Sequence, residues 1–206
     1  MSALQELAPG LYRWSEFSDE KQLNFNGYYL AHGGEAVLID PPELDGDALH
    51  MLKDTVARTG GNPLKAILLT NVHHDRASQR LKDVFQVPIH IHEQDKPLLE
   101  FSPDATFRNG DTLPCGLQVI HLQNQKSPGE CALFQKEKKW LFVGDALIGK
   151  VAGEVNQLPP DKFDDITKAK EGLKVLLNYE FEDLLLGDGE PIRGNARQTL
   201  DVFFTD

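Results

Sequence analysis

The sequence predicts an α/β fold, because short apolar strands alternate with amphipathic helices in its first half and again near its C-terminus. Between these regions, from Phe107 to Val143, short β-rich runs separated by turn residues predict antiparallel strands. No repeat, low-complexity tract or long linker interrupts the 206 residues. We therefore expect one domain covering residues 1–206.

The first predicted element is a β-hairpin. Residues 28–31 and 36–39 are two β-rich runs, and residues 32–35 between them read His-Gly-Gly-Glu. Glycine adopts positive φ at little cost, which a tight hairpin turn requires. The two runs should therefore pair as neighbouring antiparallel strands.

A helix and a buried strand follow the hairpin. Apolar residues recur at helical spacing between Asp45 and Gly60, with Asp45 or Asp47 as the expected N-cap and Gly60 as the stop. Residues 66–69 are all apolar, the pattern of a strand that is buried on both faces.

The same periodicities predict the rest of the chain. A short helix and a strand complete the first half, short strands fill the middle, and helix, strand and helix end the chain. In order, these elements are a helix over 77–85, strands over 87–92, 117–122, 132–134 and 140–143, a helix over 163–177, a strand over 183–186 and a helix over 197–204.

Charge and cysteine content exclude several classes of function. Lys and Arg total 21 against 32 Asp and Glu, a net charge of -11, so no overall basic character favours nucleic acid or an anionic membrane surface as a partner. Two cysteines are too few for a disulfide framework or a cysteine-rich zinc site. The first residues lack the basic and apolar segments of a signal peptide, and no apolar run is long enough to span a bilayer. We expect a soluble cytoplasmic protein, and its homo-oligomeric state remains open.

Ionisable residues gather where three apolar strands end. His73, His74, Asp75 and Arg76 follow one strand, Asp145 follows a second, and Asp188 follows a third, as set out in the printed sequence. Strand ends in α/β sheets are the usual place for binding and catalytic residues. Any one of these residues alone would be an ordinary turn or loop residue. Together, the three loops predict a site.

From about Leu11 to Ile192 the chain resembles the metallo-β-lactamase superfamily, which includes glyoxalase II-like hydrolases. The resemblance implies a four-layer αββα sandwich and a metal-dependent hydrolase ancestry. It is carried by the order and spacing of Asn26–Leu30, Val37–Asp40, Ile67–Thr70, Asn109–Asp111, Lys126–Gly129, Leu141–Asp145 and Gly187–Gly189.

The metal-binding motif of the family is altered in this sequence. The His-x-His-x-Asp-His loop reads Asn71-Val72-His73-His74-Asp75-Arg76, and the histidine of a His-Ser-Pro-Gly turn corresponds to Lys126. The aspartate that bridges two metals in the family is retained as Asp145, whereas the final histidine corresponds to Asp188. Four of the seven ligand positions implied by the resemblance therefore differ.

These replacements predict a site without metal. Neither an ammonium nor a guanidinium group can ligate zinc, so Lys126 and Arg76 would stand where dications belong. We expect Asp75, Asp145 and Asp188 to form a cluster that these two cations nearly neutralise. The leading hypothesis is a metallo-β-lactamase fold whose zinc site has become an internal ion-pair network, without cofactor and with altered or lost catalysis.

Two alternatives remain open at this point. A hydrolase could retain one divalent ion, Mn²⁺, Fe²⁺ or Zn²⁺, on His73, Asp75, Asp145 and Asp188, an oxygen-rich set that suits the harder ions better. Alternatively, Arg76 and Lys126 could bind a small anionic ligand in the former active-site pocket, formed by Asn71, His73, His74, Asp75, Arg76, Lys126, Asp145 and Asp188.

Overall fold

The computed structural model describes residues 4–59 and 61–205. Within them, the larger of two sheets has nine strands. Its main path runs from β1 to β7 in sequence order, and β14 joins it along β3 and also pairs with β12. The strands are β1 (Gln5–Ala8), β2 (Leu11–Ser18), β3 (Leu23–His32), β4 (Glu35–Ile39), β5 (Leu64–Leu69), β6 (Ile89–His92), β7 (Ala105–Phe107), β12 (Ile148–Gly149) and β14 (Asp188–Gly189).

The smaller sheet has five strands within the described residues, in the order β13-β11-β10-β9-β8. β11 and β13 pair in parallel, and the other neighbours are antiparallel, as predicted for the middle of the chain. These strands are β8 (Thr112–Leu113), β9 (Leu117–His121), β10 (Cys131–Gln135), β11 (Trp140–Phe142) and β13 (Asp183–Leu185).

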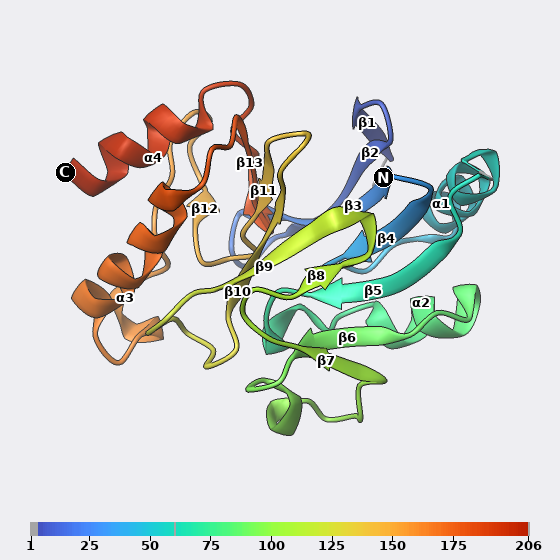
Figure 1. Cartoon of the computed structure of the whole chain (residues 1–206), viewed down its shortest axis with the longest axis horizontal. Coiled ribbons are helices and arrows are strands. Elements are labelled where there is room, and N and C mark those ends of the chain that lie inside the picture. Colours follow the sequence, from blue (N-terminus) through green and yellow to red (C-terminus); the bar gives the residue numbers. More distant parts are fainter. Residues whose placement is uncertain (1–3, 60, 206) are drawn as a thin grey trace.

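Helices cover the outer face of each sheet, as Figure 1 shows. α1 (Gly46–Arg58) and α2 (Ser78–Phe85) pack on the larger sheet, and α3 (Ile166–Leu173) and α4 (Ala196–Thr205) pack on the smaller one. A third apolar cluster fills the space between the two sheets. This arrangement confirms the predicted α/β class and the four-layer αββα sandwich.

β5 explains how one strand serves two layers. Ile67 and Leu69 contribute to the cluster under the helices, whereas Ala66 and Leu68 contribute to the cluster between the sheets. Both faces of the strand are therefore buried, which is why its sequence is an unbroken apolar run.

The predicted hairpin and first helix are confirmed. β3 and β4 pair antiparallel through a turn in which Gly33 and Gly34 have φ of 63° and 80°. α1 begins after Asp45, whose side chain accepts a hydrogen bond from the Ala48 amide at 2.8 Å. The expected stop at Gly60 lies outside the described residues.

Two predictions differ from the structure. The helix expected over 163–177 begins only at Ile166, because the Asp165 side chain accepts from the amides of Thr167 and Lys168, and it continues after Leu173 as a 3₁₀ helix, Lys174–Asn178. Strands β1 and β2 were not predicted. β2 carries polar residues between Leu11 and Trp14, its two buried positions, so its sequence lacks an apolar run.

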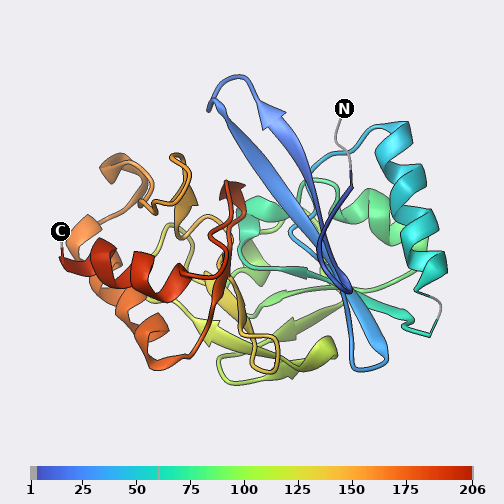
Figure 2. The same ribbon diagram turned by 90° about the horizontal axis from the view of Figure 1, so that it is seen from above.

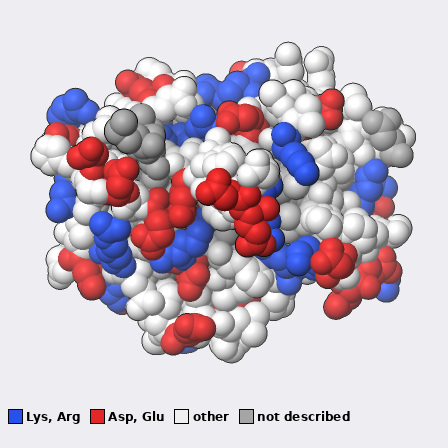
Figure 3. All heavy atoms as spheres, turned by 180° about the vertical axis from the view of Figure 1, so that it is seen from behind, with Lys and Arg blue, Asp and Glu red and all other residues white. Residues whose placement is uncertain are grey.

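The hairpin of β2 and β3 extends away from the layers, as the blue strands in Figure 2 show. Charged groups of both signs are interspersed over the face in Figure 3. Among the described residues, no helix combines the length and the apolar character needed to cross a bilayer.

Candidate functional site

The loop after β5 is shaped by Asn71. This residue caps the 3₁₀ turn Val72–His74, with its side-chain oxygen accepting from the His73 amide at 2.8 Å. Its side-chain nitrogen therefore faces inward, where it donates to Glu130 Oε1 at 2.7 Å and to Asp145 Oδ1 at 2.8 Å. Both ends of the Asn71 amide are committed to the protein.

Asp145 is the centre of the site. It is buried, and besides Asn71 it accepts a hydrogen bond from Lys126 Nζ through Oδ2. Burial by itself raises the pKa of Asp145, but the charges of His74 and Lys126 and the two hydrogen bonds outweigh it and lower the pKa to about 2. Asp145 is therefore a carboxylate at neutral pH.

His74 lies between two carboxylates. Its Nδ1 is 3.0 Å from Asp40 Oδ2, and its Nε2 is 3.5 Å from Asp145 Oδ1. The ring is buried, and glycines give it room, since a Cβ at Gly187 would lie 2.8 Å from its Cε1 atom.

Asp40 orients this histidine. Its carboxylate accepts from the Thr70 amide at 2.8 Å and from the Thr70 hydroxyl at 2.6 Å, in addition to facing His74. The end of β4 is thus tied to the end of β5, directly before the site loop.

Two buried acids of the site, Asp95 and Glu130, were not predicted from the sequence. Asp95 accepts from the amides of Val72 at 2.9 Å and Gly129 at 2.6 Å and from the Ser127 hydroxyl, so it fixes the loop that carries Lys126. Burial and the Asp145 charge raise the pKa of Glu130, the partner of Asn71, well above its usual range. Glu130 stands directly before the buried strand β10, a position where a polar residue could have been noticed.

The structure gives Arg76 a different role from the predicted one. In the described part of the chain it forms no ion pair within 4.0 Å, and it is His74 that joins Lys126 beside Asp145. Arg76 instead donates from Nη2 to the Asp40 carbonyl at 3.3 Å and lies over the Phe25 ring, 5.4 Å from its centroid. Its Nε is buried and has no hydrogen-bond partner within the described part of the chain.

The predicted cluster of three carboxylates is found only in part, because Asp188 lies near Asp145 whereas Asp75 lines a different cavity. Asp188 is buried near Asp145, and burial, with the Asp145 charge, raises its pKa to about 6. Its Oδ1 has no hydrogen-bond partner among the residues that the structure describes. Asp75 lines an adjacent cavity of about 500 Å³.

A cavity of about 430 Å³, here called the site cavity, collects most of the predicted residues. Asn71 lies beneath it through its bond to Asp145, and Asp75 lies in the neighbouring cavity, which His73 and Lys126 also line. Burial, followed by the Lys126 charge, lowers the pKa of His73. The predicted residues that line the site cavity are His73, His74, Arg76, Lys126, Asp145 and Asp188.

The placement of the side chains that could act as metal ligands decides whether the site can hold a metal ion. Among the described residues, no three His, Cys, Asp or Glu side chains are arranged so that they could hold a metal ion. The set His73, Asp75, Asp145 and Asp188 is divided between the two cavities.

Comparison with known proteins identifies the family. A model of the metallo-beta-lactamase superfamily matches residues 1–204. An uncharacterized protein of Aquifex aeolicus is 27% identical over 174 residues, which are 74% of this chain and 77% of that protein. A hydroxyacylglutathione hydrolase of Bdellovibrio bacteriovorus is 29% identical over 126 residues, but the match covers only 59% of this chain and 47% of the hydrolase.

Solved structures agree with this assignment at the level of the fold. A metallo-beta-lactamase from Pontibacter korlensis has a TM-score of 0.79 at 16% identity, covering 100% of this chain and 98% of that one. A metallo-beta-lactamase family protein from Thermus thermophilus has a TM-score of 0.70 at 20% identity, covering 97% of this chain and 80% of that one. The chain belongs to the metallo-beta-lactamase superfamily.

Proposed function

We propose that this protein is a metal-independent member of its superfamily, in which a network of ion pairs and hydrogen bonds replaces the dinuclear zinc site. The observation that carries the proposal is the Lys126 ammonium group, which donates to Asp145 at the position where the family resemblance puts a bridging aspartate between two metals. The residues present do not fit two zinc ions.

Charge balance supports this proposal. Lys126 supplies a fixed positive charge beside the carboxylate of Asp145, and His74 lies between the carboxyl groups of Asp40 and Asp145. A dication about 4 Å from a fixed cation would be opposed by about 8 kcal/mol, twice the ~4 kcal/mol of a unit pair at an effective dielectric constant of about 20. The network thus opposes metal binding as well as failing to provide ligands.

The available donors support it as well. Asn71 already donates from its nitrogen to Glu130 and Asp145, and its oxygen already accepts from His73. Zinc requires neutral imidazole or anionic oxygen and sulfur donors, which neither Lys126 nor Arg76 provides.

The consequence for chemistry is the loss of the zinc-dependent route. Metal-bound water is the usual source of hydroxide at neutral pH in metallohydrolases. We therefore do not expect this protein to share the activity named for its Bdellovibrio relative, hydroxyacylglutathione hydrolysis, by that route. A binding role in the site cavity is the function that its geometry supports best.

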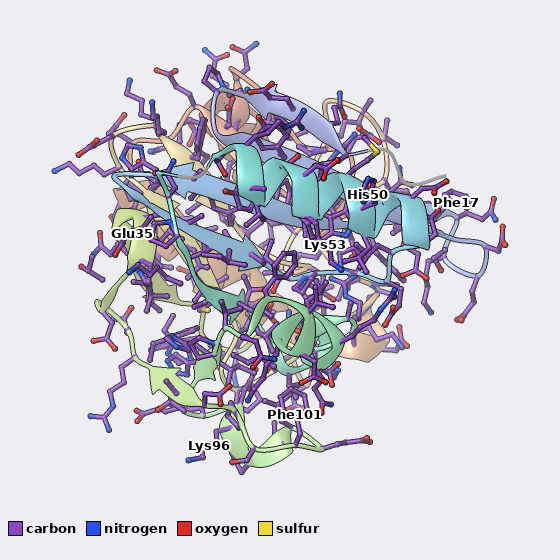
Figure 4. All side chains as sticks on the ribbon, turned by 90° about the vertical axis from the view of Figure 1, so that its right-hand side faces the viewer. Phe17, Glu35, His50, Lys53, Lys96 and Phe101 are labelled. Atoms are coloured by element: carbon purple, nitrogen blue, oxygen red, sulfur yellow. The ribbon has the colours of Figure 1, made fainter. Side chains whose placement is uncertain are left out.

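Calorimetric titration with Zn²⁺ tests the proposal. Wild-type protein should give no binding heat above the control, whereas the triple variant Asn71→His, Arg76→His, Lys126→His restores three imidazoles and should bind zinc. The single variant Lys126→His provides a milder version if the triple variant does not fold. Lys96→His, on the exposed edge in Figure 4, is the matched control for adding a surface histidine.

Either result is informative. Zinc binding by the wild type near one ion per chain, abolished in Asp145→Ala, would contradict the proposal and favour the mononuclear hydrolase. Binding by the variants alone would support the loss of the metal site through residue replacement.

A further inference from the structure

The site cavity is more basic than the protein around it. Its charged lining comprises five cations and three carboxylates, although the whole chain has a net charge of -11. An excess of positive charge in a cleft strengthens the local electrostatic field and favours a negatively charged ligand. The cations are Lys21, Arg76, Lys126, Lys150 and Lys162, and the carboxylates are Glu20, Asp145 and Asp188.

Three of these cations already have partners. Lys126 pairs with Asp145, Lys21 with Glu20 at 2.7 Å, and Lys162 with Asp161 at 3.3 Å, as the ion pairs of the structure record. Arg76 and Lys150 have no acidic partner within 4.0 Å among residues 4–59 and 61–205. They are the two cations that a ligand can neutralise.

The guanidinium group of Arg76 is fixed in an orientation that suits anion binding. Its contact with Phe25 and its bond to the Asp40 carbonyl fix the guanidinium plane, while Nε has no partner. Guanidinium groups recognise planar or tetrahedral anions through paired donors, and a guanidinium already fixed in place loses less entropy on binding.

Whereas Arg76 requires an acceptor on the ligand, Asp188 requires a hydrogen-bond donor. Only 8% of this residue is exposed, it lines the cavity, and its Oδ1 has no donor. A buried acceptor without a donor is costly, so the ligand that suits it brings an O–H or N–H group. A ligand that satisfies both residues therefore has a hydrogen-bond acceptor for Arg76 and a hydrogen-bond donor for Asp188.

The remaining wall of the cavity is apolar. It is formed by side chains of β3, of β12 and of the segment after β12, and the ribbons of the β2–β3 hairpin and of that segment rise on the same side of the molecule in Figure 2. A volume of about 430 Å³ is within the usual size of small-molecule sites. The apolar residues are Leu23, Phe25, Ile148, Leu158 and Pro159.

We propose that the site cavity binds a small organic anion that carries a hydrogen-bond donor beside its charge and an apolar body, as in a hydroxy acid or the monoanion of a phosphate monoester. The anion would contact Arg76 and Lys150, its donor Asp188, and its body the apolar wall. This inference rests on the proposed function, since it requires the cavity to be open without metal.

Calorimetry with four probes in EDTA tests the inference. Mandelate has the anion, the hydroxyl and an apolar ring; phenylacetate lacks the hydroxyl; benzyl alcohol lacks the charge; and phenyl phosphate is the phosphate counterpart. We expect mandelate or phenyl phosphate to bind at least about tenfold more tightly than benzyl alcohol, the size of effect typical of a charged hydrogen bond. Which of the two binds more tightly distinguishes carboxylate from phosphate ligands.

Variants assign the contacts. Arg76→Gln should weaken anion binding by about tenfold or more, whereas Arg108→Gln, an exposed arginine outside the cavity, should not. Arg76→Lys keeps the charge and should recover only part of the affinity. Asp188→Leu should remove the preference for mandelate over phenylacetate, and thermal melting checks that each variant is folded.

Three outcomes would overturn the inference. Absence of binding by every probe, both in EDTA and in a separate titration with zinc and no EDTA, overturns it and leaves the proposed function intact. Equal affinity for benzyl alcohol and mandelate overturns the anionic class. Binding that occurs only after zinc is added contradicts the proposed function and the inference together.

Discussion

Lys126 provides the most direct test at the scale of one residue. Lys126→Met keeps the length of the side chain but leaves the buried Asp145 carboxylate without its ammonium partner. We expect a loss of about 1–3 kcal/mol in the free energy of unfolding at pH 7. Urea unfolding measures this, with the exposed Lys136→Met as the matched control.

The pH dependence of this loss has a defined sign. The folded pKa of Asp145 lies at about 2, below its ordinary value of 3.8, so its ion pairs contribute stability above pH 3.8 and lose it as pH falls toward 2. The difference between Lys126→Met and wild type should therefore shrink in acid. A difference that stays the same at pH 3 as at pH 7 would contradict the role given to this ion pair.

The contribution of Asp188 to stability changes with pH in the opposite direction. Burial, with the Asp145 charge, raises its pKa from 3.8 to about 6, so the folded state holds a proton that the unfolded state has lost between these values, and stability falls as pH rises through them. Asp188→Asn should match wild type near pH 4 and be more stable by about 1–3 kcal/mol at pH 7.5. Chemical unfolding at both pH values measures the change. Equal stability at pH 7.5 would show that the carboxylate ionises in the fold without cost.

Most of these residues could be located from the sequence, but their roles in the site could not. Asp145, Lys126 and His73 could be placed because they end strands or fill motif positions. The central position of His74 could not, because its place in the motif is a variable one, and only the folded loop turns its ring between Asp40 and Asp145. Asp95 and Glu130 meet the site across long separations in sequence, which no local pattern reports.

At the scale of elements, the two loops that form the site depend on Asp95. Its carboxylate joins the loop after β5 to the loop between β9 and β10 through Val72, Ser127 and Gly129. Asp95→Asn would set an amide nitrogen against backbone donors. We expect a cost of about 2–4 kcal/mol, since buried groups lose their partners.

Amide hydrogen exchange distinguishes local from global effects of this change. Val72 and Gly129 should lose more protection in Asp95→Asn than amides of the β10 strand. Asp111→Asn is the control, because Asp111 is exposed and its side chain accepts a hydrogen bond from the Arg108 backbone amide. Uniform loss of protection over the whole chain would argue that Asp95 has no special role in the loops.

Elements were predicted well where the apolar pattern is strong and poorly where it is weak. β5 and β10 are buried along most of their length and α1 has apolar residues at helical spacing, whereas β2 has only two buried residues and gave no signal. The short strands β12 and β14 contain two residues each and exist through their pairing with distant partners. Such strands depend on tertiary structure, which a local pattern does not contain.

At the scale of the whole molecule, the four layers bring loops from both sheets to one cavity. The larger sheet supplies His74 and Asp188, and loops of the smaller sheet supply Lys126 and Asp145. The acidic chain thus contains a cavity with more cations than carboxylates in its lining, in which Lys126 pairs with Asp145. Overall charge alone could not predict this separation, because it averages over the surface and the site.

The central claim, a metal-independent site, is tested most directly by elemental analysis of the wild-type protein. Protein purified without chelator or nickel affinity is incubated with excess Zn²⁺, Mn²⁺ or Fe²⁺, desalted and analysed for bound metal. The ion network predicts metal far below one ion per chain under every condition. Close to one ion per chain, lost in Asp145→Ala, would contradict it.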